Sequence, residues 1–171
     1  MTDPALDASR LLETLTRHGV RFVVIGGLAA VLHGAPYQTV DCDITPESSD
    51  ENLAQLSAAL NELGARVWTG TGSGLAFEHD RRSLRDATTW NLITDRGLLD
   101  VTFEPSGTGG FDDLRQNAVI VEVEGIRFAV ASLEDVIRSK EAAGRDKDRR
   151  VLPLLHRMLA EGIEITGERG A

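Results

Sequence analysis

Two aspartates separated by a single residue, Asp41 and Asp43, are the clearest sign of chemistry in this sequence. They lie in a short stretch that we expect to be a β-strand. Side chains alternate between the two faces of a strand, so both carboxylates point to one face, while Cys42 points to the other as a small core residue. Carboxylates this close repel each other unless a cation or a proton lies between them. Oxygen ligands that leave space for water and phosphate are typical of a magnesium site.

A third acid, Asp100, stands inside the apolar run 98–103. Burying a lone carboxylate among such residues is costly, so an aspartate without a partner is not expected here. We predict that Asp100 joins Asp41 and Asp43 as a third metal ligand, and it is also a candidate catalytic base. An Asp-x-Asp pair alone also occurs at solvated strand ends, and the presence of Asp100 is what favours a metal site.

A glycine pair, Gly26 and Gly27, precedes these acids. It follows the apolar run 23–25 and leads into a helix-forming segment, 28–33, so we predict strand, tight turn, helix and strand in that order. Such a turn exposes backbone N–H groups and the positive end of the helix dipole to phosphate oxygens. Glycines and acids together predict a site for a divalent metal and a nucleoside triphosphate, where a hydroxyl attacks by in-line displacement.

The segment 138–150 is rich in positive charge, although the net charge of the chain is −9. A local basic face on an acidic protein can hold phosphate. The alternative is a solvated helix with ion pairs between side chains four residues apart. The net charge itself argues against a protein that coats nucleic acid non-specifically.

Three smaller features also allow two interpretations each. The arginines of segment 79–89 are expected to face solvent rather than a nucleic-acid backbone. The glycine- and threonine-rich segment 69–74 is expected to be a plain hairpin loop rather than a phosphate cradle. His33 is expected to be a structural cap or a surface residue rather than a nucleotide contact.

Hydrophobic periodicity predicts one α/β domain over residues 1–171, with a core of about residues 20–130 and C-terminal helices over about residues 132–161. The predicted helices cover residues 5–18, 28–33, 52–63, 111–116, 132–143 and 147–161. The predicted strands cover residues 21–25, the Asp-x-Asp segment, 65–68, 75–77, 90–94, 98–103 and the two arms of a hairpin over 118–130. Pro153 is expected to kink the last helix or shift its start.

No segment stays apolar for the roughly 20 residues that a membrane-spanning helix needs, and the N-terminus lacks the apolar region of a signal peptide. The single cysteine, Cys42, excludes an intramolecular disulfide and a cysteine-rich zinc site. We therefore expect a cytoplasmic protein.

Taken together, these motifs resemble those of the nucleotidyltransferase superfamily with the DNA polymerase β-type fold, over about residues 20–155. In particular, the chain resembles AbiEii-type and MenT-type toxins and related bacterial proteins. Their pattern is Gly-Gly or Gly-Ser, a helix, Asp-x-Asp, a later acid on a strand, and a lysine and an aspartate in a C-terminal helical segment. The matching residues here are Gly26, Gly27, Asp41, Asp43, Asp100, Lys140, Arg145 and Asp148. Gln38 stands where many relatives have arginine, which removes a phosphate contact.

The resemblance implies a mixed β-sheet flanked by helices, and a Mg²⁺-dependent enzyme that transfers a nucleoside monophosphate from an NTP to an acceptor and releases pyrophosphate. For the toxin branch it implies that the acceptor is the 3′ end of tRNA and that a cognate antitoxin protein is the partner. It also implies that Lys140 contacts the triphosphate, that Arg145 contacts a phosphate, and that Asp148 orients the lysine or assists the hydroxyl.

Two alternatives stay open. One is transfer to a protein or to a small molecule such as an aminoglycoside. The other is a non-catalytic nucleotide-binding or antitoxin-like partner, against which the retention of three acids and Lys140 argues.

Overall fold

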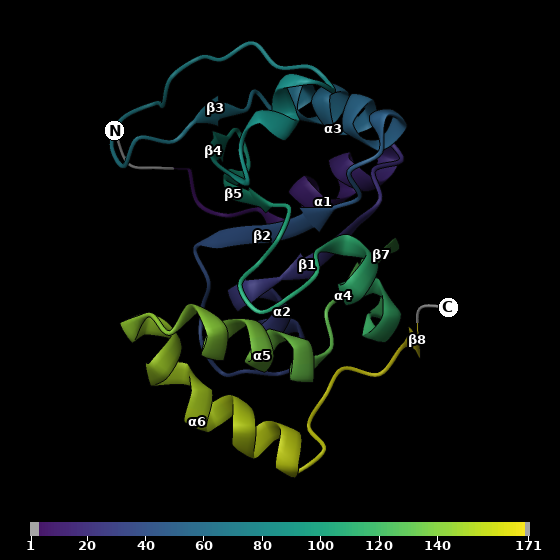
Figure 1. Cartoon of the computed structure of the whole chain (residues 1–171), viewed down its shortest axis with the longest axis vertical. Coiled ribbons are helices and arrows are strands. Elements are labelled where there is room, and N and C mark those ends of the chain that lie inside the picture. The colour runs from purple at the N-terminus through teal and green to yellow at the C-terminus, as the bar shows by residue number, and fades with distance from the viewer. Residues whose placement is uncertain (1–3, 170–171) are drawn as a thin grey trace.

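The computed structural model describes residues 4–169, and its strands form one eight-stranded mixed sheet with helices packed around it (Figure 1). The strand order is β3-β4-β5-β2-β1-β7-β6-β8. In the centre, β1 pairs antiparallel with β2 and parallel with β7, and β2 pairs parallel with β5. This architecture confirms the predicted fold class, a mixed α/β sheet flanked by helices with a C-terminal helical segment.

The strands are β1 (Phe22–Ile25), β2 (Asp41–Pro46), β3 (Arg66–Val67), β4 (Thr89–Thr94), β5 (Gly97–Thr102), β6 (Val119–Val123), β7 (Ile126–Val130) and β8 (Glu168–Arg169). The helices are α1 (Ala8–Arg17), α2 (Gly26–Leu32), α3 (Asp50–Glu62), α4 (Phe111–Asn117), α5 (Leu133–Ala143) and α6 (Asp146–Ala160), with a short 3₁₀ helix, η1 (Ser83–Asp86). The predicted elements lie within a few residues of these bounds, apart from two differences described below.

The strands beside the predicted site bury one face and leave the other partly open. Over residues 41–44 of β2 and 99–102 of β5, fully buried apolar residues alternate with partly exposed polar ones, as the two-residue period of a strand requires. The buried set is Cys42, Ile44, Leu99 and Val101. The core therefore lies behind this part of the sheet, and the acids lie on its opposite face.

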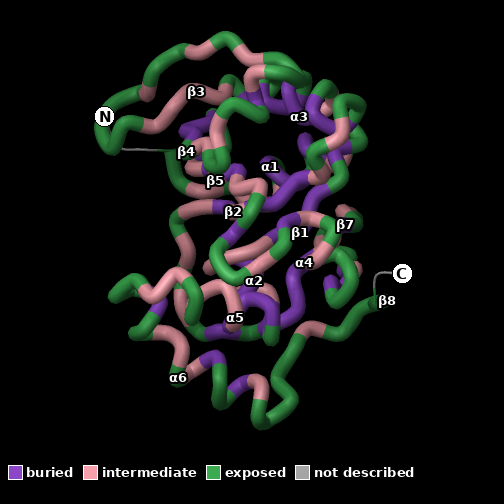
Figure 2. The backbone as a smooth tube through the Cα atoms, in the orientation of Figure 1, coloured by how far each residue is buried: buried purple, intermediate pink, exposed green. Residues whose placement is uncertain are grey.

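The helices form groups at the two ends of the molecule. In Figure 1, α1 and α3 lie in the upper half with β3, β4 and β5, whereas α5 and α6 lie together at the lower end. Figure 2 shows that the connection between β3 and η1 is largely exposed, while buried residues gather in the central strands and in α1 and α3. The two groups of helices therefore lie at different ends of the sheet.

Capping residues set the position of α5, which carries Lys140. At its start, the Ser132 hydroxyl accepts a hydrogen bond from the backbone N–H of Asp135, as the serine three residues before an acid predicts. At its end, Gly144 adopts a left-handed conformation with φ of 62°, which closes the helix and lets the chain turn into α6. Pro153 lies inside α6, which runs without interruption from Asp146 to Ala160.

The structure differs from the predicted elements at two places. The predicted strand over 75–77 was wrong, because only Leu75 makes a bridge, to Val67, and Leu75 is 62% exposed. The polar tail, for which no prediction was made, returns to the sheet as β8 and pairs with β6. Gly167 permits this approach, since a Cβ there would lie 2.3 Å from the carbonyl oxygen of Ile120. Among the described residues, no helix has the length and apolar character needed to cross a membrane.

Candidate active site

The parallel pairing of β2 with β5 brings the three predicted acids together. Asp43 lies directly opposite Asp100 in register, and Asp41 lies two residues before Asp43 on the same face. One carboxylate oxygen from each of the three lies within 4.8 Å of the others. Cys42 points into the core and is fully buried. Three carboxylates thus converge on one point from two neighbouring strands.

This convergence changes the acidity of two of the acids. Burial, followed by repulsion from Asp41 and Asp100, raises the pKa of Asp43 to about 7. Burial and the charge of Asp41 raise the pKa of Asp100 to about 6. The positive charge of Lys147 opposes both shifts without cancelling them. Three mutually repelling oxygen donors fit a divalent cation, since a cation among them would offset both the repulsion and the burial.

The glycine pair lets the backbone pass against these acids. Gly26 has a φ of +64°, and a Cβ at this position would lie 2.5 Å from Oδ2 of Asp43, so only glycine fits. A Cβ on Gly27 would lie 3.1 Å from the hydroxyl of Thr39. That hydroxyl donates to the backbone oxygen of Asp41 at 3.0 Å and is 3.1 Å from its carboxylate. The glycine turn and the first acid are thereby packed into one unit.

The C-terminal residues predicted for the site form a cluster around Asp148, which is fully buried. The guanidinium of Arg145 donates to its two oxygens at 2.7 and 3.3 Å, and the ammonium of Lys140 lies 3.4 Å from Oδ1. Burial alone would raise the pKa of Asp148, but the hydrogen bond and charge of Arg145, with the charge of Lys140, outweigh it and lower this pKa. Asp148 therefore holds two cations in place and has no oxygen free to reach a substrate.

Lys147 is a further candidate site residue, which the sequence analysis did not single out. It lines the same cleft as the acids, and its charge acts on both Asp43 and Asp100. A signal was present in the sequence, because Lys147 stands between Arg145 and Asp148 in the basic segment. The sequence alone did not show that the side chain of Lys147 faces the cleft, because its direction depends on where α6 begins.

These groups open onto one cleft of about 640 Å³. Its lining comes from the start of α2, residues 37–41, β2, β4, β5, residues 104–108, and the facing parts of α5 and α6. In Figure 1 the connection from β5 to α4 crosses in front of β2 and β1, so it forms one side of this cleft. The acids and the three cations Lys140, Arg145 and Lys147 therefore face a shared space.

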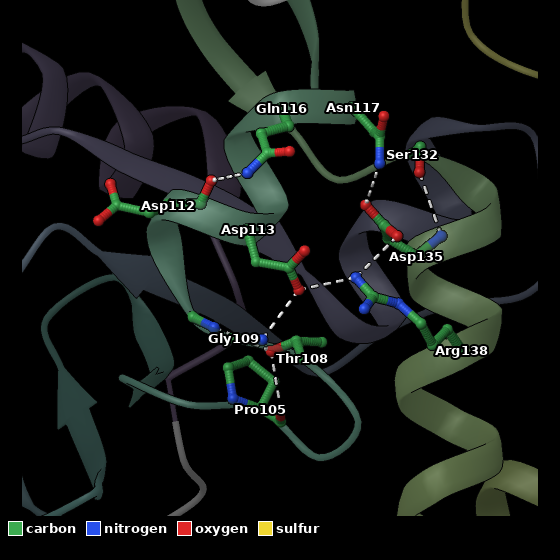
Figure 3. A network of polar contacts seen from close by, with 11 residues as sticks. Pro105, Thr108, Gly109, Asp112, Asp113, Gln116, Asn117, Ser132, Asp135 and Arg138 are labelled. Atoms are coloured by element: carbon green, nitrogen blue, oxygen red, sulfur yellow. Dashed lines mark hydrogen bonds and ion pairs between the residues drawn. The ribbon is translucent and has the colours of Figure 1, made fainter.

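A polar network anchors that connection to α5 (Figure 3). Arg138 donates to Asp113 and to Asp135, both at 2.9 Å, and so joins α4 to α5. Asp113 accepts from the backbone N–H of Gly109 at 2.8 Å, and the Thr108 hydroxyl donates to the backbone oxygen of Pro105. The wall of the cleft formed by residues 104–108 is thus fixed by hydrogen bonds at its C-terminal end.

Other candidate residues lie away from the acids or have structural roles. His33 is buried, its Nε2 is 2.8 Å from the backbone oxygen of Ala131, and its Nδ1 accepts from the backbone N–H of Ile165. This agrees with the structural interpretation and ties the C-terminal tail to the fold. Arg85 pairs with Asp50 at 2.6 Å, on the surface. The glycine-rich segment 69–74 is mostly exposed and is not part of the cleft lining.

Comparisons with known proteins identify a family and several solved structures with a similar fold. The family model described as "Nucleotidyltransferase of unknown function (DUF6036)" matches residues 6–154. None of the curated proteins matches the sequence. Among solved structures, TM1012 from Thermotoga maritima, assigned provisionally as a nucleotidyltransferase, is 21% identical over 90% of both chains with a TM-score of 0.54.

Two structures of the antibiotic-resistance factor ANT(2'')-Ia are also similar. Its solution structure is 18% identical, covers 91% of this chain and 84% of that chain, and has a TM-score of 0.56. Its crystal structure in complex with adenylyl-2''-tobramycin is 16% identical, covers 91% of this chain and 89% of that chain, and has a TM-score of 0.53. At these identities the likeness shows the fold.

Proposed function

Because the chain belongs to the nucleotidyltransferase family DUF6036, we propose that its cleft transfers a nucleoside monophosphate from an NTP to a hydroxyl group of an acceptor, with release of pyrophosphate. The observation that carries the proposal is the meeting of three carboxylates with a cationic cluster across one cleft. A triphosphate needs both groups, because its charge would be shared between a metal ion held by the acids and the cationic side chains of α5, Arg145 and α6.

Asp41, Asp43 and Asp100 are the proposed ligands of the divalent cation, which we propose to be Mg²⁺. Their oxygen donors suit this ion, and they leave room for phosphate and water. When bound, the ion neutralises phosphate charge and activates the attacking hydroxyl.

The chain's own residues then have distinct roles. Lys140, Arg145 and Lys147 bind the phosphates, and Asp148 acts through the first two as a positioning residue. The glycine turn brings the backbone N–H groups of Gly26 and Gly27 toward the nucleotide. These N–H groups have no side-chain cap, since no side chain of the preceding residue accepts from α2.

The proposed transfer is a single in-line displacement. The acceptor oxygen forms a bond to the α-phosphorus, the bond from that phosphorus to the α–β bridging oxygen breaks, and pyrophosphate leaves with the electron pair. We assign the hydroxyl proton to Asp100, the acid on the side of the cleft that faces β4.

For the acceptor we propose the 3′ end of an RNA, tRNA foremost, and for the biological role the toxin of a toxin–antitoxin pair acting in the cytoplasm, with a cognate antitoxin as its partner. The support is the motif pattern shared with AbiEii-type and MenT-type toxins. The cleft is open on one side, so the end of a large acceptor can enter it without a second domain to hold the rest.

A second candidate acceptor is an aminoglycoside. Two observations favour it: the likeness to ANT(2'')-Ia, whose complex contains adenylyl-2''-tobramycin, and the net charge of −9, which attracts a polycationic molecule. The same cleft and the same chemistry would serve either acceptor.

The test is to incubate the chain and its Asp41→Ala variant with Mg²⁺, each α-labelled NTP in turn, total tRNA, tobramycin and cell protein. Label on tRNA with the wild type alone supports the RNA acceptor and reveals the preferred base. Label on tobramycin or on protein moves the assignment to that acceptor. No transfer from any NTP refutes catalysis and leaves a non-catalytic nucleotide-binding partner.

A further inference from the structure

The lining of the cleft has two chemically different parts. All the cations that line it in residues 4–169 come from α5, from α6 and from Arg145, the residue that precedes α6. Another part of the lining, which we call the polar wall, comes from β4, β5 and the connection after β5, and none of its residues is a lysine or an arginine. The polar wall consists of Thr89, Asn91, Thr102, Glu104, Ser106 and Thr108.

The polar wall is continuous with the acids. Asn91 lies opposite Asp100 in the antiparallel pairing of β4 with β5, and Asp100 lies opposite Asp43 in the pairing of β5 with β2. Directly opposite residues on one face of such a pair have Cβ atoms about 5 Å apart. The Asn91 amide therefore lies beside the point where the acids converge.

The next pair along the strands continues the same surface. Thr89 lies opposite Thr102, and their hydroxyls are 3.5 Å apart, which places both on the face of Asn91 and Asp100. Thr89 lies two residues from Asn91 along β4, which corresponds to about 7 Å. Asn91 is exposed, and its amide has no hydrogen-bond partner among the described residues. An amide and two hydroxyls thus face the cleft within a few ångströms of the acids.

We propose that the polar wall is the acceptor subsite, that its ligand is a sugar with hydroxyl groups on neighbouring carbons and no phosphate attached to them, and that Asn91 binds the hydroxyl next to the one that reacts. This inference rests on the proposed nucleotidyl transfer and adds to it the chemical class of the acceptor.

Charge disfavours a phosphorylated acceptor group on the polar wall. A phosphate there would lie beside Glu104 with no lysine or arginine in the wall to offset its charge, whereas the triphosphate has Lys140, Arg145 and Lys147. The cationic part of the cleft therefore favours the phosphates of the donor, and the polar wall favours an uncharged part of the acceptor.

The spread of hydrogen-bonding groups selects a sugar over a protein side chain. A serine or threonine side chain presents one hydroxyl, which would leave the rest of the polar wall unused. A sugar presents adjacent hydroxyls that match an amide next to Asp100 and a pair of hydroxyls one step further along. Such chemistry occurs at the 3′-terminal ribose of RNA and in aminosugar rings.

The polar wall is also held rigid, as the selection of one hydroxyl requires. Its outer part, residues 104–108, is anchored to α5 through the network of Arg138 and Asp113 (Figure 3). Its inner part consists of strand residues. A neighbouring hydroxyl bound by Asn91 fixes which acceptor oxygen faces the α-phosphorus.

The test compares the wild type with Asn91→Ala, with Asn91→Thr as a second variant that keeps a strand-forming residue. Asn61→Ala removes an exposed asparagine from α3, away from the cleft, and is the matched control. The acceptor probes are an RNA oligonucleotide ending in cytidine-cytidine-adenosine, the same oligonucleotide with a 2′-deoxy terminus, and tobramycin. Metal-dependent NTP binding is measured in parallel by calorimetry.

We expect both Asn91 variants to raise the acceptor KM about tenfold, because the loss of one hydrogen bond to the acceptor weakens its binding by about that factor. The affinity for NTP should stay within twofold of the wild type. The 2′-deoxy terminus should cost the wild type and Asn61→Ala the same factor but leave the Asn91 variants unaffected. If tobramycin is the acceptor, its KM should rise in the same way.

Transfer with an acceptor KM that does not change in either Asn91 variant overturns the subsite. Wild-type chain that binds NTP with metal but labels neither sugar overturns the acceptor class and leaves the donor half of the proposal standing. Wild-type chain that binds no NTP refutes the proposed function and this inference with it.

Discussion

Replacing Asp148 by asparagine tests whether the cationic side of the cleft is held by a buried charge. The Asp148→Asn change keeps the size of the side chain and an oxygen that can accept from the backbone N–H of Arg145, so the start of α6 stays capped. What is lost is the negative charge shared by Arg145 and Lys140. The variant therefore isolates the electrostatic contribution.

The expected cost follows from the burial of the three groups. Breaking a buried ion pair by removing one partner costs about 3–5 kcal/mol. The side chain of Arg145 is 58% exposed and can turn into water, whereas that of Lys140 is 13% exposed and stays near its uncompensated site. We therefore expect the free energy of unfolding to fall by about 2–3 kcal/mol at pH 7.

The pH dependence has a definite sign. The pKa of Asp148 in the folded chain lies below its ordinary value of 3.8, so its stabilising charge is present above that pH and is lost as the pH falls through the folded-state pKa. The difference between wild type and Asp148→Asn should therefore be constant from pH 8 to 5 and shrink as the pH drops below 3.8.

The assay is urea unfolding of metal-free protein at several pH values. Asp146→Asn is the matched control, because it makes the same charge change nearby in the first turn of α6, at a side chain that is 84% exposed and paired with Arg149. It should cost at most about 0.5 kcal/mol. A loss in Asp148→Asn no larger than in the control, or a loss that does not depend on pH, refutes the view that this carboxylate organises the cluster.

Three further outcomes follow from the site. Lys147→Ala should raise the KM for NTP about tenfold or more, while Arg150→Ala, an exposed neighbour outside the cleft lining, should change it less than twofold in the same steady-state assay. Gly26→Ala should abolish transfer and lower the melting temperature further than Gly72→Ala does. Both positions have positive φ, but only a Cβ on residue 26 would lie 2.5 Å from Asp43. Equal effects in the two variants would contradict this. Addition of Mg²⁺ or Mn²⁺ should raise the melting temperature of the wild type in a scanning assay but not that of Asp43→Asn, and a rise of equal size in both would place the ion elsewhere.

Much of the fold could be predicted from the sequence because the helices are amphipathic and the glycines mark their ends. The local signals around Gly26 and the Asp-x-Asp pair were sufficient to place a strand, a turn and a helix. The meeting of Asp100 with Asp43 was predicted from the cost of burying a lone carboxylate, but the strand pairing that produces it was not. That pairing is the parallel register of β2 with β5, two strands separated by α3, β3 and β4, and no local pattern specifies it.

The wrong strand at Leu75 and the strand that was not predicted in the tail share a physical cause. The segment at Leu75 is apolar and has the composition of a strand, yet its side chain stays exposed and only one bridge forms. The tail at Glu168 is polar and lacks that composition, yet it pairs through its backbone and through an ion pair with Arg127 at 2.5 Å. In both places, pairing was decided by the neighbouring chain rather than by the segment's own composition.

The organisation of residues 1–171 as one domain, and the roles of individual site residues, stay predictions. The roles depend on one shared assumption, that the acids and the cations act on the same triphosphate.

The most direct test of that assumption follows the two ends of the NTP. The chain and its Asp43→Asn variant are incubated with Mg²⁺, total tRNA and tobramycin, and with the same NTP labelled either at the α-phosphorus or at the γ-phosphorus. The account predicts that the wild type moves the α-label to an acceptor and releases the γ-label as pyrophosphate, and that Asp43→Asn does neither. Transfer of the γ-label to an acceptor, or undiminished transfer by Asp43→Asn, would contradict it.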